Sequence, residues 1–165
     1  MVYYFLMNLS NKIITKQKLQ KKLHAYKKSG KTIAFTNGCF DLMHMGHVSY
    51  LEKAKGAPKQ NRILIVGLNS DKSISSIKGP SRPICPQQSR AAVLAALACV
   101  DFVVIFNEDT PYNLIKALQP DILIKGADWK GKQVIGSDIA KKLEFITYIN
   151  GFSTTNIIEE LLHTK

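Results

Sequence analysis

Two histidines three residues apart, His44 and His47, stand out because a glycine precedes the second and a short apolar run ends just before them. The segment that contains them, residues 35–47, reads FTNGCFDLMHMGH. Imidazole groups at the start of a helix can donate hydrogen bonds to phosphate oxygens, and the free backbone amides there also favour anions. Gly38 and Gly46 would allow the backbone to approach a ligand closely. We therefore expect this segment to bind phosphate.

A metal site and a pair of core histidines are the alternatives. Zinc needs three or four ligands, and the other histidines, His24 and His163, fall in expected helices at the two ends of the sequence. A core role would explain one histidine but not two around a glycine at the end of a strand. We therefore expect no metal ligands from the protein. Neither the P-loop pattern nor the Gly-x-Gly-x-x-Gly dinucleotide pattern occurs.

The composition suggests one cytoplasmic domain. The chain has 165 residues, of which 45% are hydrophobic, and no stretch approaches the ~20 apolar residues of a membrane helix. The opening MVYYFLM is short and lacks the features of a signal peptide, so we expect no membrane partner. Three cysteines without a Cys-x-x-Cys pair indicate reduced thiols.

The net charge of +11 suggests an anionic partner. Lysines crowd the first 30 residues, where we expect the solvated face of a helix. A nucleic-acid surface is the alternative, but no aromatic residues interleave with these lysines. A phosphorylated small molecule is therefore the expected ligand, and we expect no nucleic-acid partner.

Apolar runs of strand length alternate with helical patterns along the chain. Strands are expected at 32–36, 62–67, 102–106, 121–124 and 145–149, and helices at 15–29, 46–55, 87–99, 110–118, 135–142 and 154–163. A loop with one helical turn is expected at 70–86. This pattern predicts an α/β fold, a Rossmann-like doubly wound parallel sheet of about five strands. Ligands of such folds bind at the carboxyl ends of the strands, so the loops after the first, second and fourth strands should form the site.

The histidine segment resembles the signature of the HxGH nucleotidyltransferases, the cytidylyltransferase-like family, through its letters FDLMHMGH. A second stretch, GFSTTNII at residues 151–158, resembles the family's Ser-Thr-Thr-x-Ile element at the start of the last helix. That stretch alone would be an ordinary helix cap, and it becomes specific when paired with the distant histidines. The resemblance implies a single nucleotidyltransferase domain over residues 1–165, with residues 1–30 as an N-terminal helical extension.

The middle of the chain is similar to the adenylyltransferase domain of ADP-heptose synthesis, through residues 78–84, 90–97, 100–106, 109–111 and 120–128. In many bacteria this domain is fused behind a sugar kinase, and we expect it to stand alone here. The resemblance implies transfer of AMP from ATP to D-glycero-β-D-manno-heptose 1-phosphate, giving ADP-heptose and pyrophosphate. ADP-heptose supplies the heptose of the lipopolysaccharide inner core or of other surface glycans.

One stretch departs from the heptose enzymes, because Ala127 and Trp129 stand where those enzymes more often have glycine and tyrosine. Asp-Trp-x-Gly-Lys also resembles glycerol-3-phosphate cytidylyltransferases, although these tend to carry an arginine that residues 148–150 lack. A cytidylyltransferase acting on glycerol 3-phosphate or a similar phosphorylated alcohol is therefore the alternative. A nucleotide-binding regulator without turnover is another.

The resemblance also implies roles for individual residues. His44 and His47 would hold the α- and β-phosphates, and Lys78 would close on them. The nucleotide would be bound by residues of the same loops and of the last helix: Asn37, Gly38, Cys39, Phe40, Asp41, Gly46, Arg90, Lys125, Gly126, Asp128, Ser153 and Thr154. For Arg90 a plain surface arginine is the alternative, and for Asp128 a turn aspartate. Mg²⁺ would accompany ATP with little direct protein ligation, and the family implies a homodimer.

Overall fold

The computed structural model describes residues 11–149 and 151–163 and shows one sheet of five parallel strands. The part of the predicted N-terminal extension formed by residues 1–10 lies outside the described residues. The strands are β1 (Thr32–Gly38), β2 (Arg62–Asn69), β3 (Phe102–Phe106), β4 (Ile122–Gly126) and β5 (Lys142–Ile146). The helices are α2 (Lys16–Lys28), α3 (Met45–Lys55), α4 (Asp71–Lys78), α5 (Gln87–Ala96), α6 (Tyr112–Leu118) and α7 (Thr154–His163), with short 3-10 turns η1 (Pro58–Gln60) and η2 (Ala127–Trp129). The predicted fold class is confirmed.

The strand order β3-β2-β1-β4-β5 reverses direction at β1, which pairs with β2 on one side and with β4 on the other. The pairing of β1 with β2 runs to the last residues of β1, whereas its pairing with β4 ends at Phe35 and Leu123. The carboxyl ends of β1 and β4 therefore separate. Such a switch point is where α/β sheets bind ligands.

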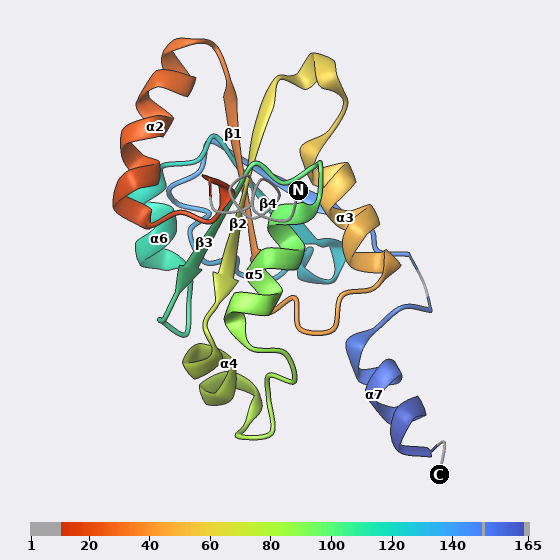
Figure 1. The fold of residues 1–165 in the computed structure, drawn as a ribbon. Helices are drawn as coiled ribbons and strands as arrows, with labels where there is room; N and C mark the ends of the chain where they lie inside the picture. The colour runs from red at the N-terminus through yellow and green to blue at the C-terminus, as the bar shows by residue number, and fades with distance from the viewer. Residues whose placement is uncertain (1–10, 150, 164–165) are drawn as a thin grey trace, which may run out of the picture.

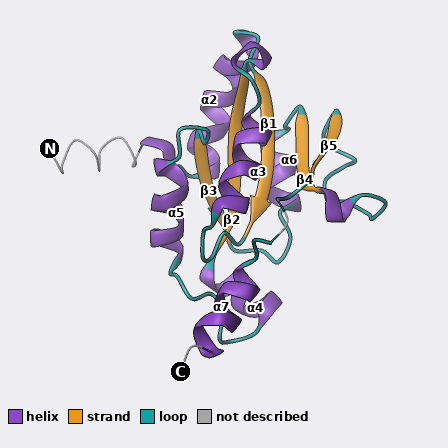
Figure 2. Ribbon diagram, turned by 90° about the vertical axis from the view of Figure 1, so that its right-hand side faces the viewer, coloured by secondary structure: helices purple, strands orange, loops and turns teal. Residues whose placement is uncertain are grey.

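The sheet has a hydrophobic layer on each face, and different helices cover the two layers (Figure 1). On one face, α3 and α5 contribute Leu51 and Leu94 to a cluster that includes Val66 of β2. On the other face, α2 and α6 contribute Leu19 and Ile115. Figures 1 and 2 both place α4 and α7 beyond the end of the sheet where the strands finish. These two helices can therefore supply groups to a site at that end.

Helix α2 shows why the lysine-rich segment folds as it does. Leu19 and Leu23 are buried against the sheet while most of the lysines face solvent. The Thr15 hydroxyl accepts a hydrogen bond from the amide of Lys18, and two lysines occupy the last turn, where they are favourable to the helix dipole. The expected solvated helix face is confirmed.

Two segments differ from the prediction. The predicted loop at 70–86 contains the eight-residue helix α4, because the Ser70 hydroxyl caps its start and the glycine- and proline-rich part begins only at Gly79. The predicted helix at 135–142 is wrong, since turns occupy residues 135–139 and β5 starts at Lys142. β5 is an edge strand with one neighbour, so it tolerates an alternation of polar and apolar residues. The apolar run 145–149 instead predicts a strand that starts about three residues too late.

β1 and β2 each extend two residues further than predicted, to Gly38 and Asn69. Polar Asn37 therefore lies on the strand, paired in register with Gly67. No helix within the described residues is long and apolar enough to span a membrane.

Replacing Phe35 by alanine should lower the free energy of unfolding by about 3–5 kcal/mol. The Phe35 side chain is fully buried, and its ring lies where a Cβ on Gly67 would stand, only 2.7 Å from the nearest ring atom. Urea denaturation measures the change. Val93→Ala, at an α5 position that is 45% exposed, should change the free energy by less than about 0.5 kcal/mol. Equal effects of the two substitutions would contradict this account of the core.

Candidate active site

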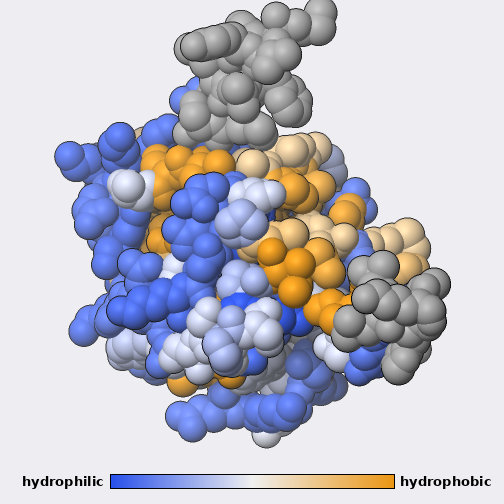
Figure 3. Space-filling view, turned by 60° about the horizontal axis from the view of Figure 1, so that its bottom comes forward, coloured by the Kyte–Doolittle hydropathy of each residue, from blue (hydrophilic) through white to orange (hydrophobic). Residues whose placement is uncertain are grey.

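A pocket of about 870 Å³ opens at the carboxyl ends of the strands. This end comes forward in Figure 3, where hydrophilic and hydrophobic surfaces meet. The structure brings together most of the predicted site residues as its lining: Asn37, Gly38, Cys39, Phe40, Asp41, His44, His47, Lys78, Lys125, Gly126, Asp128, Ser153 and Thr154. Gly46 and Arg90 are the predicted residues that do not line it.

The two histidines lie against each other at the start of α3. His44 is the N-cap of this helix and His47 lies in its first turn, with ring centroids 3.9 Å apart. The Phe40 ring packs on His47 at 5.4 Å, and the Phe152 ring stacks on His44 at 6.2 Å. The Nδ1 atoms of both histidines are buried without a hydrogen-bond partner among the described residues. Buried polar atoms normally have partners, so these two atoms are candidates for hydrogen bonds to a ligand.

Gly46 makes room for neighbouring side chains of the protein. A Cβ at this position would lie 3.0 Å from the His44 ring and 3.2 Å from the Cβ of Phe152. The missing side chain therefore lets the segment before α7 approach α3. The Thr154 hydroxyl donates to the carbonyl of Leu42 at 3.2 Å, which fixes the start of α7 beside the histidine loop.

Ser153 precedes α7, and its hydroxyl accepts a hydrogen bond from the amide of Asn156 at 3.0 Å. It is therefore a helix cap, and it also lines the pocket. The Ser-Thr-Thr element and the histidines, more than 100 residues apart in the sequence, meet in one place.

Lys125 lies on the floor of the pocket between the separating ends of β1 and β4. Its side chain is almost buried, its Nζ donates to the Oδ1 of Asn37, and it lies 5.2 Å from the centre of the Trp129 ring. Trp129 is 37% exposed and lines the pocket, so it is not a core residue. Gly126 makes room here, because a Cβ would overlap the Tyr148 ring and the Asp128 carboxylate.

A family model for cytidylyltransferase-like proteins matches residues 35–160. The chain belongs to the cytidylyltransferase-like family. It is 57% identical over 143 residues to the bifunctional protein HldE of a Nitratiruptor species, covering 87% of this chain and 30% of that protein. It is 53% identical over 146 residues to the bifunctional protein HldE of Helicobacter pylori, covering 88% of this chain and 31% of that protein.

Among solved structures, the chain is similar to the lipopolysaccharide core biosynthesis protein from Thermoplasma volcanium. The TM-score is 0.60 and the sequence identity 27%, over 72% of this chain and 98% of that one. The chain spans about a third of the length of the curated relatives that it matches.

Burial favours the neutral form of both histidines in this cytidylyltransferase-like protein. It lowers the pKa of His47 from 6.5 to about 4, and the nearby His44 and Lys78 add to this effect. Burial also lowers the pKa of His44. Because the folded-state pKa of His47 lies below its unfolded value, its contribution to stability is present above pH 6.5 and is lost as the pH falls through about 4. A bound anion would oppose the shift.

Burial lowers the pKa of Lys125 to about 8, against the opposing effect of the Asp128 carboxylate. Within the described residues its one hydrogen bond goes to a neutral amide oxygen. Binding of an anionic phosphate nearby would therefore stabilise the ammonium form.

Asp41 lines the pocket, but its carboxylate already has partners. Arg82 donates to it from Nε at 2.9 Å and pairs with it through Nη2 at 2.6 Å, and the amides of Ile84 and Cys85 also donate to it. Burial would raise the pKa of Asp41, but the two amides and the Arg82 charge together hold it below its ordinary value. Asp41 therefore anchors the histidine loop to the segment after α4.

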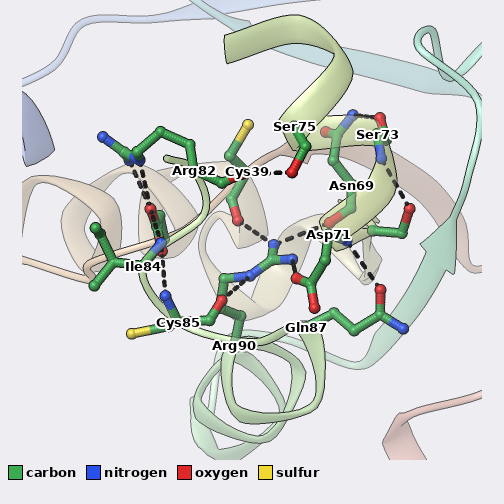
Figure 4. A network of polar contacts seen from close by, with 12 residues as sticks. Cys39, Asn69, Asp71, Ser73, Ser75, Arg82, Ile84, Cys85, Gln87 and Arg90 are labelled. Carbon is green, nitrogen blue, oxygen red and sulfur yellow. Dashed lines mark hydrogen bonds and ion pairs between the residues drawn. The ribbon is translucent and has the colours of Figure 1, made fainter. Parts of the chain in front are cut away.

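Arg90 is neither a surface arginine nor part of the lining, since its side chain is 1% exposed and is surrounded by hydrogen-bond acceptors (Figure 4).

Of the residues that sequence reading missed, Asn69, Asp109, Thr110 and Tyr148 also line the pocket. Asp109 and Thr110 follow β3, and the rule that ligands bind at strand ends could have found them. No group of three His, Cys, Asp or Glu residues within the described chain is arranged to bind a metal.

Titration of the histidines by NMR should give His47 a midpoint near pH 4 in the free protein, because burial disfavours its charged form. Adding ATP should raise that midpoint, because phosphate negative charge stabilises the imidazolium ion. Adenosine, which lacks phosphate, is the matched control and should leave it unchanged. A midpoint at the ordinary 6.5 in the free protein, or one that ATP lowers, would contradict the site described here.

Proposed function

We propose that the protein is a nucleotidyltransferase that transfers AMP from ATP to D-glycero-β-D-manno-heptose 1-phosphate, giving ADP-heptose and pyrophosphate. The observation that carries the proposal is the meeting of two imidazoles and the start of α7 in one pocket at the switch point of the sheet. The Nδ1 atoms of both imidazoles lack hydrogen-bond partners among the described residues. Both features suit a triphosphate.

In the proposed reaction, a phosphate oxygen of the sugar 1-phosphate attacks the α-phosphorus of ATP in line. The new P–O bond forms as the bond to the β-phosphate oxygen breaks, and pyrophosphate leaves with that electron pair. No protein nucleophile is required, and such transfers depend on positioning and on stabilising charge. His44 and His47 would donate to the oxygens of the α- and β-phosphates, where negative charge increases in the transition state.

Lys78 and the start of α7 would bind the departing pyrophosphate. Lys78 is exposed at the end of α4 and is close enough to His47 for its charge to lower that pKa. Ser153 and Thr154 line the same pocket at the helix N-terminus, where free amides favour anions. In a loose transition state, negative charge is spread over several phosphate oxygens. Neutral histidines and the exposed Lys78 ammonium around the same phosphates would stabilise this charge.

The nucleoside would lie over the end of β4. Asp128 could accept hydrogen bonds from ribose hydroxyls, and the exposed Trp129 ring offers an apolar surface for the base. Mg²⁺ would be bound mainly to phosphate oxygens, and it supplies charge neutralisation when bound. The donor set fits this, because no three His, Cys, Asp or Glu side chains of the described residues are grouped to hold a metal ion, and the Asp41 carboxylate is paired with Arg82.

Several comparisons support heptose as the acceptor. Residues 78–84, 90–97 and 120–128 resemble the adenylyltransferase domain of ADP-heptose synthesis. That domain is often fused behind a sugar kinase, and the chain matches about a third of relatives named bifunctional. The similar Thermoplasma protein is named for lipopolysaccharide core biosynthesis. The alternative, cytidylyl transfer to glycerol 3-phosphate, lacks this support. A cytoplasmic location, a homodimer and the absence of a nucleic-acid partner stay predictions.

His44→Ala and His47→Ala should each lower kcat by about 10²–10³-fold, the usual effect of losing a donor that stabilises transition-state charge. Circular dichroism should show both variants folded. His24→Ala is the matched control, because His24 is an exposed histidine on α2 outside the pocket, and it should keep normal turnover. Near-normal turnover of both site variants would exclude the mechanism.

A product assay should detect pyrophosphate and ADP-heptose when ATP is supplied with D-glycero-β-D-manno-heptose 1-phosphate. The matched reactions replace ATP by CTP, or the sugar by glycerol 3-phosphate, and should give much less product. Preferential use of CTP with glycerol 3-phosphate would establish the cytidylyltransferase instead. No product from any pair, in protein that binds ATP, would favour a nucleotide-binding regulator.

A further inference from the structure

Arg90 lies on the inner face of α5 and holds segments that are far apart in the sequence (Figure 4). Its Nη1 donates to the carbonyls of Cys39 at 2.6 Å and Asn69 at 2.9 Å. Its Nε donates to the carbonyl of Cys85 at 2.9 Å, and its Nη2 pairs with the Asp71 carboxylate at 2.7 Å. One guanidinium thus joins the ends of β1 and β2, the start of α4 and the segment before α5.

The contact with Cys39 acts on the histidines. The next residue, Phe40, has a positive φ of 45°, which is uncommon for a residue with a side chain. This backbone turn places the Phe40 ring against His47. Because Arg90 holds the carbonyl immediately before the turn, it stabilises the conformation that orients the Phe40 ring and, through it, the His47 imidazole.

The contact with Asp71 acts on Lys78. Asp71 is the first residue of α4 and Lys78 is the last. A second hydrogen bond, from the amide of Asp71 to the side-chain oxygen of Gln87 at 3.0 Å, joins the same two helix starts. Helix α4 is therefore attached to α5 at its first residue, Asp71. Lys78 lies at the opposite end of α4, where Gly79 (φ 93°) follows it.

We propose that Arg90 is a positioning residue, which fixes the histidine loop and helix α4 relative to each other so that His47 and Lys78 act on the same phosphates. The proposal rests on the proposed function for its kinetic consequence. Arg90 does not reach the ligand, because its side chain is buried outside the pocket lining and its hydrogen bonds go to protein acceptors. The proposal requires the planar guanidinium of arginine, whose nitrogens point to separate acceptors. A lysine ammonium is a single compact group and cannot donate to all of these acceptors at once.

Arg90→Lys is the principal test, because it keeps the charge and removes the fork. We expect kcat to fall by about 10²-fold, the effect of a small misplacement of catalytic groups, while the Kd for ATP measured by calorimetry changes by less than about threefold. The His47 midpoint measured by NMR in the free variant should rise from about 4 toward 6.5, because a displaced Phe40 ring admits water. Gln88→Lys, at an exposed position of the same helix, is the matched control and should change none of the three.

Each outcome bears on the proposal. Loss of ATP binding in Arg90→Lys would make Arg90 a phosphate ligand and overturn it, as would unchanged kcat. A lower kcat with the His47 midpoint still near 4 would also overturn it, because the loss would then not act through the histidine loop. Since the NMR and calorimetric measurements need no turnover, they test Arg90 even if the wild-type protein fails the product assay.

If Arg90→Lys does not fold, Asp71→Ala tests the second contact. This side chain is 41% exposed, so the substitution is tolerable, and it removes both carboxylate oxygens, whereas asparagine would keep an acceptor for Arg90. We expect kcat to fall by about 10-fold, a smaller misplacement effect than that of losing the whole fork. The His47 midpoint should rise slightly, because the Lys78 charge that helps to lower it is displaced. Normal kcat in a folded Asp71→Ala variant would overturn the proposed link to Lys78.

Discussion

The structure depends on the place where β1 stops pairing with β4. The two strands pair at Ala34–Ile122 and Phe35–Leu123 and then separate, although both continue for three more residues. Separation leaves main-chain and side-chain polar groups at the centre of the sheet without strand partners. Lys125 and Asn37 bridge the opening with one hydrogen bond. The pocket is thus a consequence of strand order, because only a strand with neighbours on both sides can open such a gap inside a sheet.

Polar contacts from separate parts of the chain then fix the groups around that opening. Thr154 joins the start of α7 to the histidine loop, Asp41 joins the loop to the segment after α4, and Arg90 joins it to β2 and α5. Loops tolerate many conformations unless such contacts restrict them. Three independent attachments on one short loop explain how Phe40 keeps an uncommon backbone conformation while its ring packs on His47.

The sequence predicts the local features of this protein better than the distant ones. The apolar runs at 32–36, 62–67, 102–106 and 121–124 depend on neighbouring residues, and each is found as a strand within two residues of the predicted bounds. The histidine motif likewise lies at the predicted helix start after β1. Arg90 is different, because the sequence around it suits a surface helix and its burial is caused by carbonyls up to 51 residues away. Likewise, β5 is set by its pairing with β4 and by the ion pair of Glu144 with Arg62. Such partners are brought together only by the strand order.

The free pocket also contains groups that the protein alone does not satisfy. Two histidine Nδ1 atoms are buried without partners in the described chain, and the Lys125 ammonium has a neutral partner. A buried polar atom that lacks a hydrogen-bond partner destabilises a folded protein by roughly 1–3 kcal/mol, and burial also disfavours a charged group such as the Lys125 ammonium. A bound polyanion would relieve all three at once, since phosphate oxygens can accept from imidazole N–H groups and stabilise the ammonium. A neutral ligand would offer less to these groups than an anionic one, so the same features support the proposal of a phosphorylated ligand.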